Sequence, residues 1–126
     1  MKAVASDAAP AAIGPYSQAV VANGMVFCSG QIPLLADGSD MLNADAAHQA
    51  RQCLLNLKAV LEAAGSSMSR VVKTTIFLKN MVDFGAVNEV YAEAFGEHRP
   101  ARATVEVARL PKDAKVEIDC VALLNE

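Results

Sequence analysis

Two segments near the end of the chain carry charged residues in a pattern suited to binding a carboxylic acid. Residues 102–107 and 115–120 alternate polar and apolar side chains with the period of two typical of half-buried strands. Arg102 follows Pro100, which stiffens the backbone there, and a guanidinium held in place can bind a carboxylate through two parallel hydrogen bonds. Glu117 could donate or accept a proton. From the local pattern alone, a solvated strand face with ordinary surface ion pairs is the simpler interpretation.

The same alternation predicts which side chains face a core. In each segment we expect the apolar residues to line a core and the polar residues to project to the other side. The expected core set is Ala103, Val105, Val107, Val116, Ile118 and Cys120, and the opposite set is Arg102, Thr104, Glu106, Glu117 and Asp119. Residues 110–113 include a proline and an aspartate, which favour a turn, so we predict that the two strands form an antiparallel hairpin.

Length and composition indicate one domain with a core of small side chains. The 126 residues fall within the usual size of a single domain, which we assign to 1–126. Hydrophobic residues make up 53% of the chain, yet it has no Trp and few aromatic residues, which is compatible with close packing and a sizeable subunit interface. A net charge of −3 argues against a nucleic-acid binder, which normally carries a basic surplus.

The cysteines and histidines do not form the pattern of a metal centre. Cys28, Cys53 and Cys120 are odd in number and lack C-x-x-C spacing, so we expect buried free thiols. His48 and His98 are too few and too far apart for a histidine cluster, and we predict no metal. The N-terminus does not resemble a secretory signal, and no apolar run approaches about 18 residues, so we expect a cytoplasmic protein without a membrane partner.

The first third of the chain predicts short strands. Residues 2–5 could form a first strand, and apolar runs at 19–21 and 25–28 flank Asn23-Gly24, a strong hairpin signal. The second run leads into Ser29-Gly30. A glycine directly after a strand marks either a turn or a close approach of the backbone to a ligand, and the local sequence favours the turn.

The middle of the chain predicts two helices around a further strand. We expect one long helix from an N-cap at Asn43 to a stop at Gly65, and a second from an N-cap at Asp83 to Gly96. Residues 71–78 form a β-branched run suited to a strand. The predicted fold class is α+β, with both helices on one face of a mixed or mostly antiparallel sheet.

Four separated motifs appear in the same order as in a known family. They are IGPYSQAV (13–20), CSGQIP (28–33), VVKTTIFLKNMVDFGAVNEVY (71–91) and PARATVEVARLPKDAKVEID (100–119). By these motifs the chain resembles the RidA/YjgF family of reactive-intermediate deaminases, and the match covers nearly the whole chain. The resemblance implies a chorismate-mutase-like fold and a homotrimer, with a central β-barrel and sites in clefts between subunits.

The resemblance also implies an activity and a set of site residues. Members of the family hydrolyse 2-iminobutanoate and 2-iminopropanoate, or the enamine tautomer 2-aminoacrylate, to 2-keto acids and ammonia without a cofactor. The substrate-carboxylate arginine of the family corresponds to Arg102, and its water-positioning glutamate to Glu117. The other pocket positions correspond to Tyr16, Ser29, Gly30, Asn88 and Thr104, with Gly30 and Thr104 acting largely through backbone groups.

Two departures from the family pattern affect which residue roles and substrate sizes can be expected of this chain. Some members have a cysteine where this chain has Thr104, so a thiol role does not transfer to this position, although a backbone carbonyl role does. The segment 95–100 is shorter than in some relatives, which affects the pocket rim and hence the size of substrate accepted.

Three other functions are compatible with the resemblance. The chain could bind small 2-keto carboxylates through Arg102 without catalysis, or act as a ribonuclease or translation inhibitor, or as a holdase-type chaperone after oxidative modification. The acidic net charge and the lack of a catalytic histidine pair weigh against ribonuclease activity.

Overall fold

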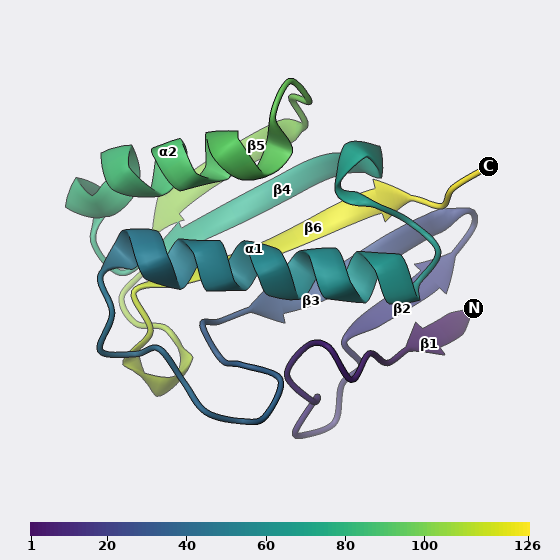
Figure 1. Ribbon diagram of the computed structural model, residues 1–126, viewed down its shortest axis with the longest axis horizontal. Helices are drawn as coiled ribbons and strands as arrows, with labels where there is room; N and C mark the ends of the chain where they lie inside the picture. Colours follow the sequence, from purple (N-terminus) through teal and green to yellow (C-terminus); the bar gives the residue numbers. More distant parts are fainter.

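A six-stranded mixed sheet carries both helices on one face (Figure 1). The computed structural model describes residues 1–126. The strands lie in the order β1-β2-β3-β6-β4-β5. Their bounds are β1 Lys2–Val4, β2 Ala19–Ala22, β3 Met25–Gln31, β4 Val71–Leu78, β5 Ala101–Glu106 and β6 Val116–Leu123, and the helices are α1 Ala46–Ala63 and α2 Phe84–Phe95. The α+β prediction, with two helices on one face of a mixed sheet, is confirmed.

The predicted hairpin of the last two strands is wrong. β4 lies between β5 and β6, pairing parallel with β5 and antiparallel with β6. The physical reason is the crossover through α2, because a helix that follows β4 and packs on the sheet returns the chain to run parallel beside β4. β6 then fills the central position between β3 and β4.

The core lies between the helices and the sheet. On β6 the alternation is confirmed, since Val116, Ile118 and Cys120 are buried beneath the helices. On β5 the prediction is wrong, because Ala103 and Val105 are exposed on the face that the helices do not cover. β5 is an edge strand, so only one neighbouring strand and one side of the sheet protect it.

The helix-free face of the sheet carries exposed apolar side chains beside charged ones and is uncovered in the single chain. Val105, Phe77 and Glu117 occupy one row across β5, β4 and β6, and Phe27 lies opposite Val121 on β3 and β6. Phe27 is 46% exposed and Val105 is 40% exposed. A sheet face of this kind is usually covered by another layer of protein.

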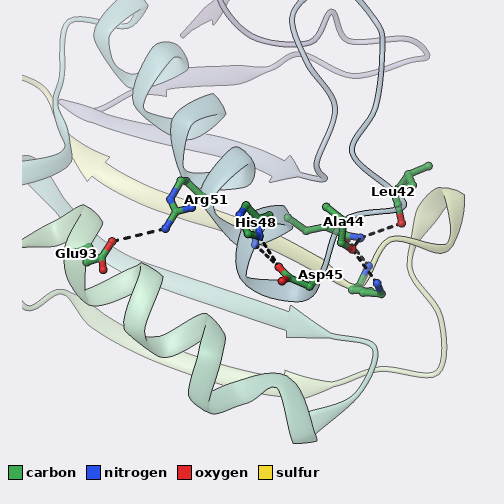
Figure 2. Close-up of polar contacts among 8 residues, drawn as sticks. Leu42, Ala44, Asp45, His48, Arg51 and Glu93 are labelled. Atoms are coloured by element: carbon green, nitrogen blue, oxygen red, sulfur yellow. Dashed lines mark hydrogen bonds and ion pairs between the residues drawn. The ribbon is translucent and has the colours of Figure 1, made fainter.

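Helix α1 begins at Ala46 with Asp45 as its N-cap, and not with Asn43 as predicted. The Asp45 carboxylate accepts a hydrogen bond from the His48 backbone N–H at 2.9 Å, and its Oδ1 lies 2.7 Å from Nδ1 of the same histidine (Figure 2). Gly65, with φ of 85°, follows the last residues of the helix as predicted. One turn further along α1 than His48, Arg51 lies 3.8 Å from Glu93 of α2, so the pair joins the two helices (Figure 2).

Turn residues fix the other ends as the sequence predicted. Asn23 and Gly24 have φ of 52° and 74° and connect β2 to β3 in an antiparallel hairpin, which confirms that prediction. Gly96, with φ of 61°, ends α2. Asp83 occupies the N-cap position of α2 as predicted, although its side chain makes no capping hydrogen bond. The Asn80 side chain accepts a hydrogen bond from the Val82 backbone N–H in the turn that precedes α2.

The fully buried Gln49 side chain joins the segment before α1 to the start of β6. Its amide donates to the carbonyls of Leu42 and Ala44, and its oxygen accepts from the Lys115 backbone N–H at 2.8 Å. We expect Gln49→Leu to lower the free energy of unfolding by about 2–4 kcal/mol, because it leaves several buried backbone groups unpaired. Urea denaturation at a fixed protein concentration measures this. Gln52→Leu on the same helix is the control, and an equal loss in both variants would contradict the assignment.

Candidate active site

Four of the predicted site residues line one cavity of about 540 Å³. Tyr16, Ser29, Gly30 and Glu117 meet there, from the loop before β2, from β3 and from β6. The Ser29 hydroxyl donates to the carbonyl of Ser17 at 2.6 Å, which ties β3 to the loop that carries Tyr16. Residues far apart in the sequence are thus fixed around one space, which we call the Glu117 cavity.

Gly30 is required by a close approach and not by a turn, so the turn prediction is wrong. It lies within β3, where the pairing with β6 shifts register between Cys28 and Gln31. A Cβ added at Gly30 would lie 2.5 Å from Oε2 of Glu117 and 2.8 Å from its Cδ. Only a glycine therefore allows the carboxylate to lie against the backbone of β3.

Burial raises the pKa of Glu117 above the ordinary value for glutamate, and the negative charge of Asp119 raises it further. The pKa of Asp119 is raised too, mainly by burial, although hydrogen bonds from Thr75 oppose this. The shift follows from placing two carboxylates two residues apart on one half-buried strand face. A carboxyl group with a raised pKa is suited to accepting a proton from water and returning it.

Arg102 lies in a second cavity, of about 440 Å³, beneath α2. Its Nη1 donates to the Asn88 side-chain oxygen at 2.7 Å, and its guanidinium lies 4.8 Å from the centre of the Tyr91 ring and 5.5 Å from that of Phe84. The family motifs indicate Asn88 as a pocket residue, whereas Tyr91 and Phe84 are not among the predicted site residues. Their spacing from Asn88 by three or four positions is the signal that could have indicated this cluster.

Thr104 and Glu106 share the helix-facing side of β5 with Arg102. The Thr104 hydroxyl is buried and makes no hydrogen bond. Thr104 lies beside Ile76 of β4 rather than in either cavity. Glu106 accepts a hydrogen bond from the Met81 backbone N–H at 2.8 Å and so holds the segment before α2.

The register of β4 places Arg102 and Glu117 on opposite faces of the sheet. Arg102 lies opposite Thr74, and Glu117 lies opposite Phe77. Thr74 and Phe77 are separated by an odd number of positions on one strand, so their side chains point to opposite faces. In one chain the Glu117 carboxylate and the Arg102 guanidinium are therefore separated by the thickness of the sheet.

The structure also places the cysteines and histidines. The three cysteines are buried and free, as expected. His98 lines the same cavity as Arg102 and contacts the Val71 carbonyl through Nε2, far along the chain from His48 at the start of α1. The structure contains no group of three or more His, Cys, Asp or Glu side chains that could hold a metal ion, and neither helix has the length and hydropathy of a membrane span.

Comparison with known proteins decides the family. A family model described as endoribonuclease L-PSP matches residues 6–124. The chain belongs to this family, the RidA/YjgF family. Among curated RidA/YjgF proteins, the Escherichia coli 2-iminobutanoate/2-iminopropanoate deaminase is 50% identical over 125 residues, 97% of each chain.

Solved structures of the RidA/YjgF family show the same fold. The crystal structure of the Escherichia coli YjgF gene product superposes with a TM-score of 0.93 at 50% identity, covering 99% of this chain and 100% of that one. The structure of Escherichia coli TdcF with bound serine superposes with a TM-score of 0.93 at 45% identity, with the same coverage. The six-stranded mixed sheet with two helices is thus the fold of the family.

The contact between Gly30 and Glu117 predicts a measurable pKa change. In Gly30→Ala the new methyl group displaces the Glu117 carboxylate toward water, so we expect its pKa to fall toward the ordinary value of about 4.3. A carbon-13 NMR titration of the carboxyl groups measures it. Gly85→Ala is the control, because a Cβ there meets nothing within 4 Å. An unchanged pKa in Gly30→Ala would show that the close approach does not control this carboxylate.

Proposed function

We propose that this protein is a 2-imino acid deaminase that hydrolyses 2-iminobutanoate, 2-iminopropanoate and the tautomer 2-aminoacrylate to 2-keto acids and ammonia. The observation that carries the proposal is the carboxylate of raised pKa held against Gly30, in a cavity that Tyr16 and Ser29 complete. The 50% identity to a protein named as this deaminase supports it. The three free cysteines suit the reducing cytoplasm, where we place the protein.

The proposed reaction needs Arg102 and Glu117 in one place, and we call the two cavities that hold them half-sites. We infer a homotrimer with a central β-barrel and the chorismate-mutase-like arrangement, in which Arg102 of one subunit completes the Glu117 cavity of its neighbour. The uncovered face, with the apolar residues Phe27 and Val105, supports this inference, because a neighbouring sheet would cover it. The position of Arg102 on the edge strand β5 supports it too, since an edge strand is free to approach another chain.

The proposed reaction needs little activation of the nucleophile. Arg102, oriented by Asn88, binds the substrate carboxylate and fixes the electrophilic C=N carbon. Glu117 accepts a proton from water as its oxygen bonds to that carbon, and then returns the proton to nitrogen. Glu117 then transfers the hydroxyl proton of the tetrahedral intermediate to the nitrogen, so the C–N bond breaks as the C=O bond forms, and the 2-keto acid and ammonia are released. Gly30 and Thr104 act largely through backbone groups, and no step requires a cofactor.

A binder of small 2-keto carboxylates is the second candidate. Arg102 is already oriented by Asn88 within its own cavity, on a face that lacks Glu117, and this arrangement binds a carboxylate without catalysis. Calorimetry that detects 2-ketobutyrate binding, together with no acceleration of imine hydrolysis, would favour the binder.

Removing the guanidinium tests how the substrate is held. We expect Arg102→Ala to lower kcat/KM for 2-iminobutanoate by about 10- to 100-fold, since a hydrogen-bonded charged pair contributes about 1.5–3 kcal/mol. The measurement is the release of 2-ketobutyrate when the protein is added to a threonine dehydratase reaction. Arg51→Ala, on the outer surface of α1, is the matched control. If the Arg102→Ala variant released 2-ketobutyrate as fast as the wild type, the proposed role of Arg102 in binding the substrate carboxylate would be wrong.

The pH dependence tests Glu117. The residue must be ionised to accept a proton from water, so kcat/KM falls as the pH drops through its pKa. Because burial and Asp119 raise that pKa, we expect the midpoint of the acid limb to lie above the ordinary value of about 4.3. Glu117→Gln should lower kcat by about 100-fold or more and abolish this limb. An unchanged acid limb in Glu117→Gln would assign the ionisation to another group.

A further inference from the structure

The turn that leads into β6 has a strained backbone at two successive residues. Lys112 has φ of 56° and ψ of 23°, and Asp113 has φ of 58°. Lysine and aspartate both adopt this left-handed conformation less readily than glycine, and lysine less readily than aspartate, so the free-energy cost is larger at Lys112. Strain of this kind persists where the surroundings hold it in place, and it is concentrated at functional sites.

Four contacts hold the turn in this conformation. The Asp113 carboxylate accepts two hydrogen bonds from Arg109, at 2.7 and 3.3 Å. The backbone N–H of Asp113 donates to the Leu110 carbonyl, and that of Ala114 to the Pro111 carbonyl, each at 3.1 Å. Leu110 and Ala114 are buried on either side. The strained conformation is therefore held firmly, and it fixes the direction in which Lys112 leaves the backbone.

This turn places Lys112, whose ammonium has no ion-pair partner, in the lining of the Glu117 cavity. Lys112 and Glu117 are the only charged residues among those that line it. Two other lysines make hydrogen bonds through their ammonium groups. The Nζ of Lys79 donates to the Ala108 carbonyl at 2.7 Å, and the Nζ of Lys115 donates to the Ala44 carbonyl at 2.8 Å. Lys112 is exposed and makes no hydrogen bond or ion pair. Its ammonium is free to interact with whatever enters the cavity.

We propose that Lys112 determines which substrate side chains this site accepts, favouring 2-imino acids with a second carboxylate over neutral ones. This inference rests on the proposed deaminase function. With the α-carboxylate bound by Arg102 and the C=N carbon beside Glu117, the substrate side chain is the part that remains to meet Lys112. An exposed ammonium attracts a carboxylate modestly and in a salt-dependent way, so Lys112 is a specificity-determining residue and not a catalytic one.

The experiment compares imines of glutamate and methionine, which have similar length and differ in charge. An amino acid oxidase generates each imine, and the release of the 2-keto acid gives kcat/KM. We expect the wild type to favour the glutamate imine by about 2- to 5-fold at low salt, and the preference to shrink in 0.5 M NaCl. Lys112→Gln should remove the preference, Lys112→Glu should reverse it and Lys112→Arg should keep it.

Two further variants separate charge from structure. Lys58→Gln makes the same charge change on α1, outside this cavity, and should leave the preference intact. Lys112→Gly relieves the strained φ, so we expect it to unfold at a higher temperature than the wild type and still lose the preference. An active wild type whose preference is the same in Lys112→Gln and Lys112→Glu would overturn the inference and leave the deaminase function standing. A wild type that accelerates neither imine would overturn the deaminase function and this inference with it.

Discussion

The parallel pairing of β5 with β4 determines on which face of the sheet Arg102 lies relative to Glu117. It results from the crossover through α2, which returns the chain beside β4 and leaves β6 between β4 and β3. Given that pairing, the alternation along each strand directs Arg102 toward α2 and Glu117 toward the uncovered face. A hairpin of β5 and β6 would have produced a different sheet and a different pair of faces. The division into two half-sites is therefore a property of the topology.

The two half-sites are built from different physical interactions. Around Arg102, the Asn88 amide and two aromatic rings orient a cation that stays exposed to solvent. Around Glu117, the absence of a side chain at Gly30 admits a carboxylate to a half-buried position, where desolvation raises its pKa. The first arrangement suits recognition of a carboxylate and the second suits proton transfer, so the proposed reaction needs both half-sites in one place.

Two features of the Glu117 cavity are unfavourable for folding. The raised pKa of the Glu117 carboxyl group and the left-handed backbone conformation of Lys112 each cost stability in the isolated chain. Buried networks elsewhere offset them, including the hydrogen bonds of Gln49 and the bond between Thr74 and Tyr91. Unfavourable features gathered at one cavity are characteristic of sites kept for function.

The sequence by itself determined the element types and most of their ends. The alternation of polar and apolar residues identified β6, and the Asn23-Gly24 pair identified the hairpin of β2 and β3. Gly65 and Gly96 marked the ends of the two helices. These signals act over a few residues, so they can be recognised in the sequence. The family motifs supplied the candidate site residues, which local pattern alone could not separate from ordinary surface charges.

Only the tertiary structure decided which strands pair, since alternation specifies faces and not partners. It also decided that Gly30 serves Glu117 and that Lys112 lines the same cavity, because both relations join segments distant in the sequence.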